Sequence, residues 1–327
     1  MQSLRQRKLI SIICPVFNEE QTIPLFYERV ERVLAPLRER FDFEILFTNN
    51  GSTDRTLPIL RSLRERDAEV QVLTLSRNFG YQASVQAGLS HVKGEAIVVI
   101  DVDCEDPPEL IEQFVAKWEE GYDVVYGIRY DRQEWWPLKK CRNTFYRILR
   151  AVADMDIVLY MAEFALLGAN VRDAIISNRN TFPFFRSEIG YAGFSKFGIR
   201  YMRQPRIAGQ THYNLTRMTT FALAGILTSS TFLMRIAAYA WPVMTLLALG
   251  LMIGDAITHS STGFRWAVIG LLLYISFFLM AFGLYIARIY KNGMGRPVFI
   301  VDWKNSSVNE STGERNRRQP DLIKAAL

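Results

Sequence analysis

The sequence predicts an α/β domain, with a mainly parallel sheet and helices on both faces, followed by an interfacial helix and two transmembrane helices. Two observations support this fold class. Short apolar runs alternate with longer stretches of helical spacing from residue 8 to about 128, and two long charge-free stretches follow in the C-terminal third. With 49% hydrophobic and 22% charged residues, a disordered chain is excluded.

Five short apolar runs, rich in β-branched and aromatic residues, are predicted as strands at residues 9–17, 44–48, 70–75, 96–100 and 123–128. Four of them precede a stretch with helical spacing. Near-continuous apolar strands that alternate with helices are typical of a mainly parallel sheet covered on both faces. Ligands of such sheets bind beyond the carboxyl ends of the strands, so we expect the functional site there.

Polar residues follow three of the predicted strands, in the segments Pro15–Glu20, Asn49–Asp54 and Asp101–Pro108. No G-x-G-x-x-G follows the first strand and no G-x-x-x-x-G-K-[ST] occurs, which disfavours a Rossmann dehydrogenase and a P-loop NTPase. The three cysteines lie far apart without a C-x-x-C pair, so neither a disulfide framework nor a zinc ribbon is indicated. We expect no nucleic-acid partner.

The third of these segments carries a cluster of acidic residues. Asp101, Asp103 and Glu105 alternate, so in an extended segment their side chains would point the same way. Clustered carboxylates repel one another unless a cation lies between them, and oxygen ligands suit Mg²⁺ or Mn²⁺ shared with a diphosphate. The alternative is a solvated acidic loop that opens a helix at Pro107-Pro108.

Residues 236–254 and 266–287 contain no charged side chain and, as helices, would extend roughly 28 and 33 Å, close to the ~30 Å hydrocarbon thickness of a bilayer. A pair of buried helices in a soluble protein is the alternative. Residues 288–327 carry eight Lys and Arg against four Asp and Glu, so the positive-inside rule places both termini in the cytoplasm. Residues 213–235 have an apolar stripe that predicts an interfacial helix or an ordinary core helix.

The series PVFNEE (15–20), NGSTD (50–54) and DVDCEDPPE (101–109), followed by two apolar stretches, resembles the family-2 glycosyltransferases with the GT-A fold. More narrowly, it is similar to the polyprenyl-phosphate glycosyltransferases, which include dolichol-phosphate mannosyltransferases and bacterial undecaprenyl-phosphate glycosyltransferases. The resemblance implies a cytoplasmic GT-A domain at 1–212, an interfacial helix at 213–235, spans at 236–254 and 266–287, and a basic cytoplasmic tail at 288–327.

The resemblance implies an enzyme of the cytoplasmic (inner) membrane that transfers one sugar, with inversion, from a nucleotide-sugar donor to the phosphate of a polyprenyl phosphate. We expect a UDP-linked donor, undecaprenyl phosphate as the acceptor, and Mg²⁺ or Mn²⁺ as the cofactor. A lipid phosphate, with a second pKa near 6, arrives ionised, so no strong general base is needed. The task is then electrostatic, because two anions must be held together. Homo-oligomerisation is left open.

Carried over by position, the resemblance also assigns site residues. The catalytic residues it implies are Asp103, Arg129 and Glu163, although Glu163 is equally plausible as a structural acid. The implied metal ligands are Asp101, Asp103 and Glu105. The lipid phosphate is assigned to Arg129, Arg132 and Lys139, in a basic segment that could instead be a solvated loop. The nucleotide sugar is assigned to Pro15, Phe17, Glu19, Asn50, Asp101, Val102, Asp103, Arg206 and His212.

Four positions depart from the pattern of that family. Asn49-Asn50 replaces the usual Asp-Asp, Glu105 replaces Gln, His212 replaces Lys, and Ala165 replaces the Arg of an Asp-Phe-Arg-Leu run. These changes leave the donor specificity open and motivate a second hypothesis, a catalytically degenerate membrane scaffold. A third hypothesis, a family-2 polysaccharide synthase, is disfavoured because two spans hardly form a channel and no Q-x-x-R-W segment occurs.

Overall fold

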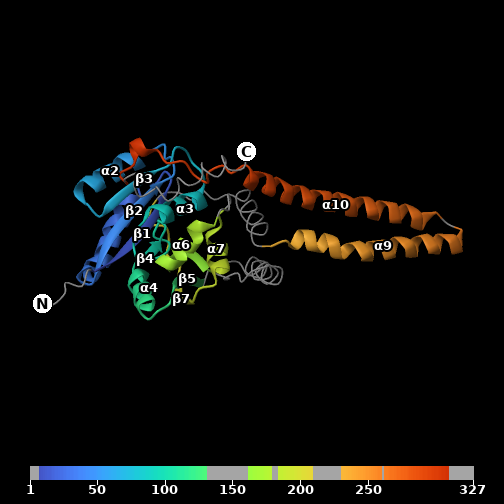
Figure 1. Ribbon diagram of the computed structural model, residues 1–327, viewed down its shortest axis with the longest axis horizontal. Helices are drawn as coiled ribbons and strands as arrows, with labels where there is room; N and C mark the ends of the chain where they lie inside the picture. The colour runs from blue at the N-terminus through green and yellow to red at the C-terminus, as the bar shows by residue number, and fades with distance from the viewer. Residues whose placement is uncertain (1–6, 131–160, 179–182, 209–229, 260, 309–327) are drawn as a thin grey trace, which may run out of the picture. The chain divides into compact units, whose positions relative to one another are not determined.

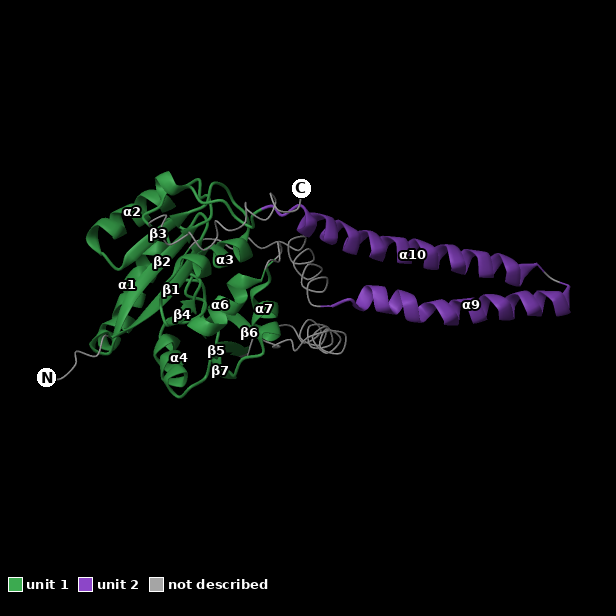
Figure 2. Cartoon of the chain, in the orientation of Figure 1, with its two compact units in different colours: residues 1–141, 158–214, 297–327 green, residues 142–157, 215–296 purple. Residues whose placement is uncertain are grey.

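The computed structural model describes residues 7–130, 161–178, 183–208, 230–259 and 261–308. The chain divides into two compact units (Figure 2). Unit 1 comprises residues 1–141, 158–214 and 297–327, and unit 2 comprises residues 142–157 and 215–296.

Unit 1 is built on a seven-stranded sheet with the order β3-β2-β1-β4-β6-β5-β7 (Figure 1). Strand β6 is antiparallel to both of its neighbours, and every other pair is parallel. The predicted mainly parallel sheet is therefore confirmed, including all five predicted strands. The strands are β1 (Lys8–Val16), β2 (Phe41–Asn49), β3 (Val70–Thr74), β4 (Ala96–Val99), β5 (Val124–Tyr130), β6 (Met161–Gly168) and β7 (Lys196–Met202).

Helices cover both faces of this sheet, as predicted (Figure 1). Successive side chains of β1 point to opposite faces of the sheet, so Ile12 packs in one hydrophobic cluster and Ile13 in the other. The first cluster includes α1 (Ile23–Leu34), α2 (Thr56–Arg66) and α4 (Leu110–Glu119), and the second includes α3 (Tyr81–His91), α6 (Ala169–Ser177) and α7 (Phe185–Ala192). A short 3-10 helix, η1 (Ala35–Glu39), follows α1.

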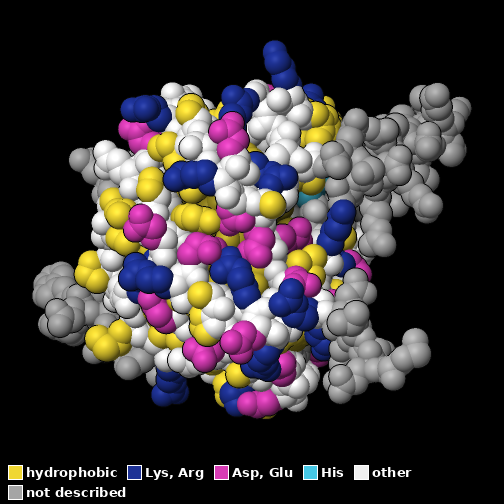
Figure 3. Space-filling view, turned by 90° about the vertical axis from the view of Figure 1, so that its left-hand side faces the viewer, with side chains coloured by type: hydrophobic (Ala, Val, Ile, Leu, Met, Phe, Trp, Pro, Cys, Tyr) yellow, Lys and Arg dark blue, Asp and Glu magenta, His cyan; other side chains and the backbone are white. Residues whose placement is uncertain are grey.

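The surface of unit 1 in Figure 3 shows acidic and basic side chains interspersed, without a patch of one sign. A protein that binds nucleic acid by its phosphates needs a basic stripe or patch. The described residues on this face form no basic stripe.

Residues 297–308, here called the C-terminal strap, pack along the outer edge of the sheet. Val301 forms an antiparallel bridge with Leu75, and the Asp302 N–H donates to the carbonyl of Thr74 at 2.8 Å. The rings of Phe299 and Trp303 lie 6.1 and 5.8 Å from that of His91 at the end of α3. The strap, which contains the 3-10 helix η2 (Trp303–Asn305), thus covers the edge of β3 that would otherwise be open to pairing.

This packing divides the range predicted as a basic tail at 288–327. Its first residues continue the second apolar helix, residues 297–308 form the strap, and residues 309–327 lie outside the described residues.

Unit 2 contains two antiparallel helices, α9 (Phe232–Thr258) and α10 (Thr262–Gly293), which contain the predicted spans (Figure 1). Both are long and apolar enough to cross a membrane, and only 11% of the most apolar window of each is buried. Exposed side chains such as Leu246 and Leu273, at 69% and 68%, disfavour the alternative of soluble core helices. The carboxylate of Asp255 accepts the N–H groups of Gly263 and Phe264 at 3.0 and 2.6 Å, which caps the start of α10.

The predicted interfacial helix at 213–235 falls mostly outside the described residues. Its last four residues, 232–235, are the first residues of α9.

Candidate active site

The three polar segments picked out in the sequence follow β1, β2 and β4, which are neighbours in the sheet. Because these strands are parallel, their carboxyl ends meet at one edge. The first two segments are bonded to each other: the Asn18 N–H donates to Ser52 Oγ at 3.0 Å, and Asn18 Oδ1 accepts the N–H of Thr53 at 2.8 Å. Asn18 has a φ of 56°, a left-handed conformation that Asn tolerates better than most residues.

Asn49 and Asn50 both have structural partners. Asn49 Oδ1 accepts the N–H of Ser52 at 3.1 Å, and Asn50 Oδ1 accepts that of Phe79 at 2.9 Å. The Asn50 amide also donates to Asn78 Oδ1 at 3.2 Å, which an ionised Asp in its place would be unable to do. The Asn50 of this chain therefore holds the loop before α3.

Gly51 allows this loop to approach closely. Its φ is 70°, and a Cβ at this position would lie 2.6 Å from the carbonyl carbon of Arg77. A side chain here would displace backbone, so glycine is required by both conformation and space.

The acidic segment after β4 forms turns, so the extended conformation in which Asp101, Asp103 and Glu105 would point the same way is not present. Cys104 has a φ of 56°, which breaks the alternation. Glu105 forms an ion pair with Arg203, while Asp103 lies 3.4 Å from Arg206. The metal-ligand roles of all three acids stay predictions, with Asp101 and Asp103 the two carboxylates that remain once Glu105 is paired.

The two remaining carboxylates fit a cation. Burial and the neighbouring carboxylates of Asp103 and Asp106 raise the pKa of Asp101 to about 7. Burial also raises the pKa of Asp103, although the charge of Arg206 opposes this. Carboxylates that resist ionisation because they are buried close to other acids gain most from a divalent ion, and their oxygens are the ligands that Mg²⁺ and Mn²⁺ prefer.

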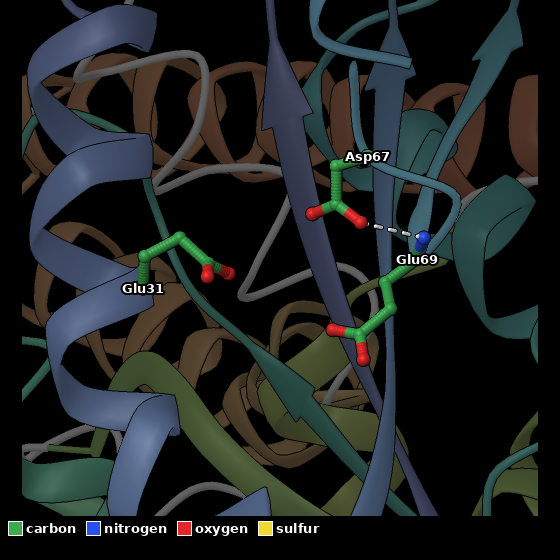
Figure 4. A group of neighbouring side chains, drawn as sticks. All are labelled: Glu31, Asp67 and Glu69. Carbon is green, nitrogen blue, oxygen red and sulfur yellow. Dashed lines mark hydrogen bonds between the residues drawn. The ribbon is translucent and has the colours of Figure 1, made fainter. Parts of the chain in front are cut away.

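A different acidic group, Glu31, Asp67 and Glu69, brings three carboxylates within 4.8 Å of one another (Figure 4). It lies where β3 begins, at the opposite end of the strands from the polar segments. Arg38 Nη2 lies 2.8 Å from Glu31 and 2.7 Å from Glu69, and the hydroxyl of Tyr27 donates to Asp67 at 2.6 Å. Each of the three carboxylates thus already has a side-chain partner, which indicates a structural role for the group.

Arg129, predicted to bind lipid phosphate, is held by a carboxylate that sequence reasoning missed. Its Nε and Nη2 donate to the two oxygens of Asp106 at 2.9 and 2.6 Å, and the Tyr201 hydroxyl bonds the same carboxylate. Asp106 is 1% exposed, and the side chain of Arg129 is 17% exposed. Two of the three guanidinium nitrogens are thus committed to a buried ion pair, and the charge and hydrogen bonds of Asp106 raise the pKa of Arg129.

Glu163 lies beside Asp101. The antiparallel pairing of β4 and β6 ends at Val99 and Ala165, and Glu163 lies in β6 beyond this last pair. The charges of both acids raise the pKa of Tyr81, whose hydroxyl donates to Asp101 at 2.8 Å. Arg186, which sequence reasoning missed, lies 2.9 Å from Glu163. The predicted catalytic acid is therefore part of the same acidic site.

The segment after β7 lies along the acidic segment. The N–H groups of Gln204 and Ile207 donate to the carbonyls of Glu105 and Asp103 at 2.9 and 3.0 Å. Arg206 pairs with Glu19 as well as Asp103. This residue, predicted to bind the nucleotide sugar, therefore links the segment after β1 to the segment after β4. An arginine shared by two carboxylates is also the kind of group that binds a diphosphate.

Comparison with known proteins identifies the family. Residues 11–168 match the family described as glycosyl transferase family 2. The chain is 36% identical over 94% of its length to an uncharacterized glycosyltransferase, YkcC, of Bacillus subtilis (strain 168), of which it covers 95%. The chain belongs to glycosyl transferase family 2.

Other similar proteins of this family carry a more specific name. The prophage bactoprenol glucosyl transferase homolog of Escherichia coli (strain K12) is 34% identical over 89% of this chain and 98% of its own. The bactoprenol glucosyl transferase of Shigella phage SfV is 32% identical over 89% and 97%. Among solved structures, the fold is similar to that of glucosyl-3-phosphoglycerate synthase from Mycobacterium tuberculosis in complex with Mn²⁺, UDP and phosphoglyceric acid. The TM-score is 0.47 and the sequence identity 18%, over 68% of this chain and 77% of that one.

The remaining predicted positions of this glycosyltransferase divide into two groups. Pro15, Phe17 and Val102 follow or end β1 and β4, at the same edge as Asp101. Arg132, Lys139 and His212 lie outside the described residues. For the first group the structure gives a place at the strand ends, and their binding roles stay predictions.

Proposed function

We propose that this glycosyltransferase transfers a single sugar, with inversion, from a UDP-linked donor to the phosphate of a polyprenyl phosphate, undecaprenyl phosphate being the expected acceptor. The observation that carries the proposal is the pair of mutually repelling carboxylates, Asp101 and Asp103, at the end of β4, in a chain that continues into two apolar helices. The names of the relatives, which match over nearly their whole length, support the acceptor class.

The proposed cofactor is Mg²⁺ or Mn²⁺, held by Asp101 and Asp103. When bound, such an ion would offset the negative charge that develops on the departing nucleoside diphosphate. Arg206 is placed to exchange its carboxylate partners for the diphosphate, since it already reaches from Glu19 to Asp103. The acceptor phosphate is an anion at neutral pH, so the chain needs no strong general base and its task is to hold two anions in register.

We further propose that the catalytic unit and both termini lie on the cytoplasmic side of the membrane. The chain enters α9 from unit 1 and, after α10, the strap belongs to unit 1 again. If both helices cross the bilayer, the two ends of this hairpin emerge on the same side. The excess of Lys and Arg after residue 287 assigns that side to the cytoplasm.

The test is a transfer assay. Purified full-length protein is incubated with undecaprenyl phosphate, a panel of UDP- and GDP-sugars, and Mg²⁺, Mn²⁺ or EDTA, and the lipid fraction is analysed by mass spectrometry. We expect one added sugar, only with a divalent ion, and an inverted anomeric configuration by NMR. Several added sugars would favour a polysaccharide synthase, and nucleotide binding without transfer would favour the scaffold hypothesis.

A further inference from the structure

Buried polar atoms without hydrogen-bond partners are concentrated at one place in the described part of unit 1. All of them belong to three side chains: Nε2 of Gln82, both carboxylate oxygens of Glu163, and Nε of Arg186. More than nine in ten buried polar groups in proteins have a partner, and each exception costs about 1–3 kcal/mol. A cluster of exceptions marks a place with hydrogen-bonding capacity for a polar ligand.

These three side chains are neighbours. Gln82 Oε1 accepts the N–H of Phe185 at 2.8 Å, and the next residue is Arg186. Arg186 Nε lies 2.9 Å from Glu163 Oε1, yet the N–H is not aimed at that oxygen, so the two charges are close without a hydrogen bond. The side chain of Glu163 is 10% exposed, and that of Arg186 is 23% exposed. Both partners therefore keep hydrogen-bonding capacity for a third group.

The cluster adjoins the proposed diphosphate site. Gln82 follows Tyr81, whose hydroxyl donates to Asp101 at 2.8 Å, and the charges of both Asp101 and Glu163 act on that hydroxyl. If the diphosphate of the donor lies at Asp101 and Asp103, the group attached to it that reaches this cluster is the sugar.

The chemistry of the cluster selects a neutral polyol. Glu163 only accepts hydrogen bonds, while the free Gln82 and Arg186 N–H groups only donate, so the ligand must do both, as adjacent hydroxyl groups do. An ionised phosphate only accepts hydrogen bonds, so it would leave both Glu163 oxygens without a donor, which disfavours the acceptor headgroup as the ligand. The opposite charges of Glu163 and Arg186 balance, so a charged sugar gains nothing.

We propose that Gln82, Glu163 and Arg186 bind the hydroxyl groups of the donor sugar, and that Gln82 and Arg186 are specificity-determining residues of this enzyme. The inference rests on the proposed function, because it presumes a nucleotide-sugar donor. It assigns Glu163 to sugar recognition rather than to fold stability.

The test compares UDP with UDP-glucose. Calorimetry on the full-length protein with Mn²⁺ gives the ratio of their Kd values for the wild type and for Gln82→Met and Arg186→Met. We expect UDP-glucose to bind wild type at least about fivefold tighter than UDP, and each variant to lose most of that difference while its Kd for UDP stays within twofold. Gln113→Met, on an exposed position of α4, is the matched control and should behave as wild type.

The outcomes separate the inference from the proposed function. Equal binding of UDP and UDP-glucose by wild type, or variants that keep the wild-type ratio, would overturn the sugar site even if transfer to lipid occurs. The variants could lose the difference between the Kd values for UDP and UDP-glucose while the wild type transfers no sugar to undecaprenyl phosphate. That result would support the sugar site and contradict the proposed acceptor. Thermal unfolding of each variant verifies that the fold is retained.

Discussion

The buried pair of Asp106 and Arg129 makes a quantitative prediction about stability. Asp106→Asn keeps the size of the side chain but removes the charge that balances Arg129. Breaking a buried ion pair by removing one partner costs about 3–5 kcal/mol, because the other charge stays buried without a counterion. At about 2–4 °C per kcal/mol for a domain of this size, the apparent Tm should fall by about 6–20 °C.

An exposed ion pair of the same unit provides the control. Arg29 and Glu109 form a bidentate pair in which Glu109 is 53% exposed, and such pairs contribute about 0–1 kcal/mol. Glu109→Gln should therefore lower the Tm by no more than about 4 °C. Both variants are measured by near-UV circular dichroism of the full chain in detergent. Equal losses for the two variants would refute the assignment of Asp106 and Arg129 as a buried pair.

A double substitution distinguishes charge imbalance from lost packing. Asp106→Leu combined with Arg129→Met removes both charges and leaves apolar side chains of similar reach. Since no unbalanced charge stays buried, the double variant should recover more than half of the loss seen with Asp106→Leu alone. Additive losses would mean that the site depends on shape rather than on charge pairing.

Three further predictions concern the metal site and the membrane topology. In calorimetry, Asp103→Asn should abolish the decrease that Mn²⁺ causes in the Kd for UDP. Glu105→Gln should keep most of that decrease, because Glu105 pairs with Arg203. The same loss in both variants would support Glu105 as a metal ligand. Because the pKa of Asp101 is raised, the folded metal-free protein binds more protons than the unfolded chain between about pH 4 and 7. Its free energy of unfolding should therefore fall as the pH rises through this window. Urea titrations should show a smaller fall for Asp101→Asn. In intact bacteria, an impermeant maleimide should label Ser261→Cys in the loop before α10 but not Lys304→Cys in the strap, and the reverse pattern would invert the topology.

Much of the fold could be predicted because it depends on local patterns. Near-continuous apolar runs of five to nine residues predict buried parallel strands, and polar residues after them predict the site edge. Strand β7 was missed because it is only partly buried, with Tyr201 the one buried residue among its seven. Strand β6 is an eight-residue apolar run, interrupted by Glu163, which was interpreted as a functional acid and not as part of a strand.

The errors in the site have physical causes of a different kind. The alternation of Asp101, Asp103 and Glu105 predicts a shared direction only if the chain is extended, and the left-handed Cys104 between them gives no warning because cysteine is not a turn residue. The partners of Glu105 and Arg129 are distant in sequence, at Arg203 and Asp106, and no local pattern announces them.

The strap closes the edge of the sheet at β3. Hydrogen bonds from Ser76 to Ile300 and from Asp302 to Thr74 join it to that edge, and the next amide along it, of Leu75, donates to the carbonyl of Asn49 at 2.8 Å. One continuous ladder therefore runs within unit 1 from the strap to the segment that carries Asn50, so a substitution that loosens the strap should also loosen that segment.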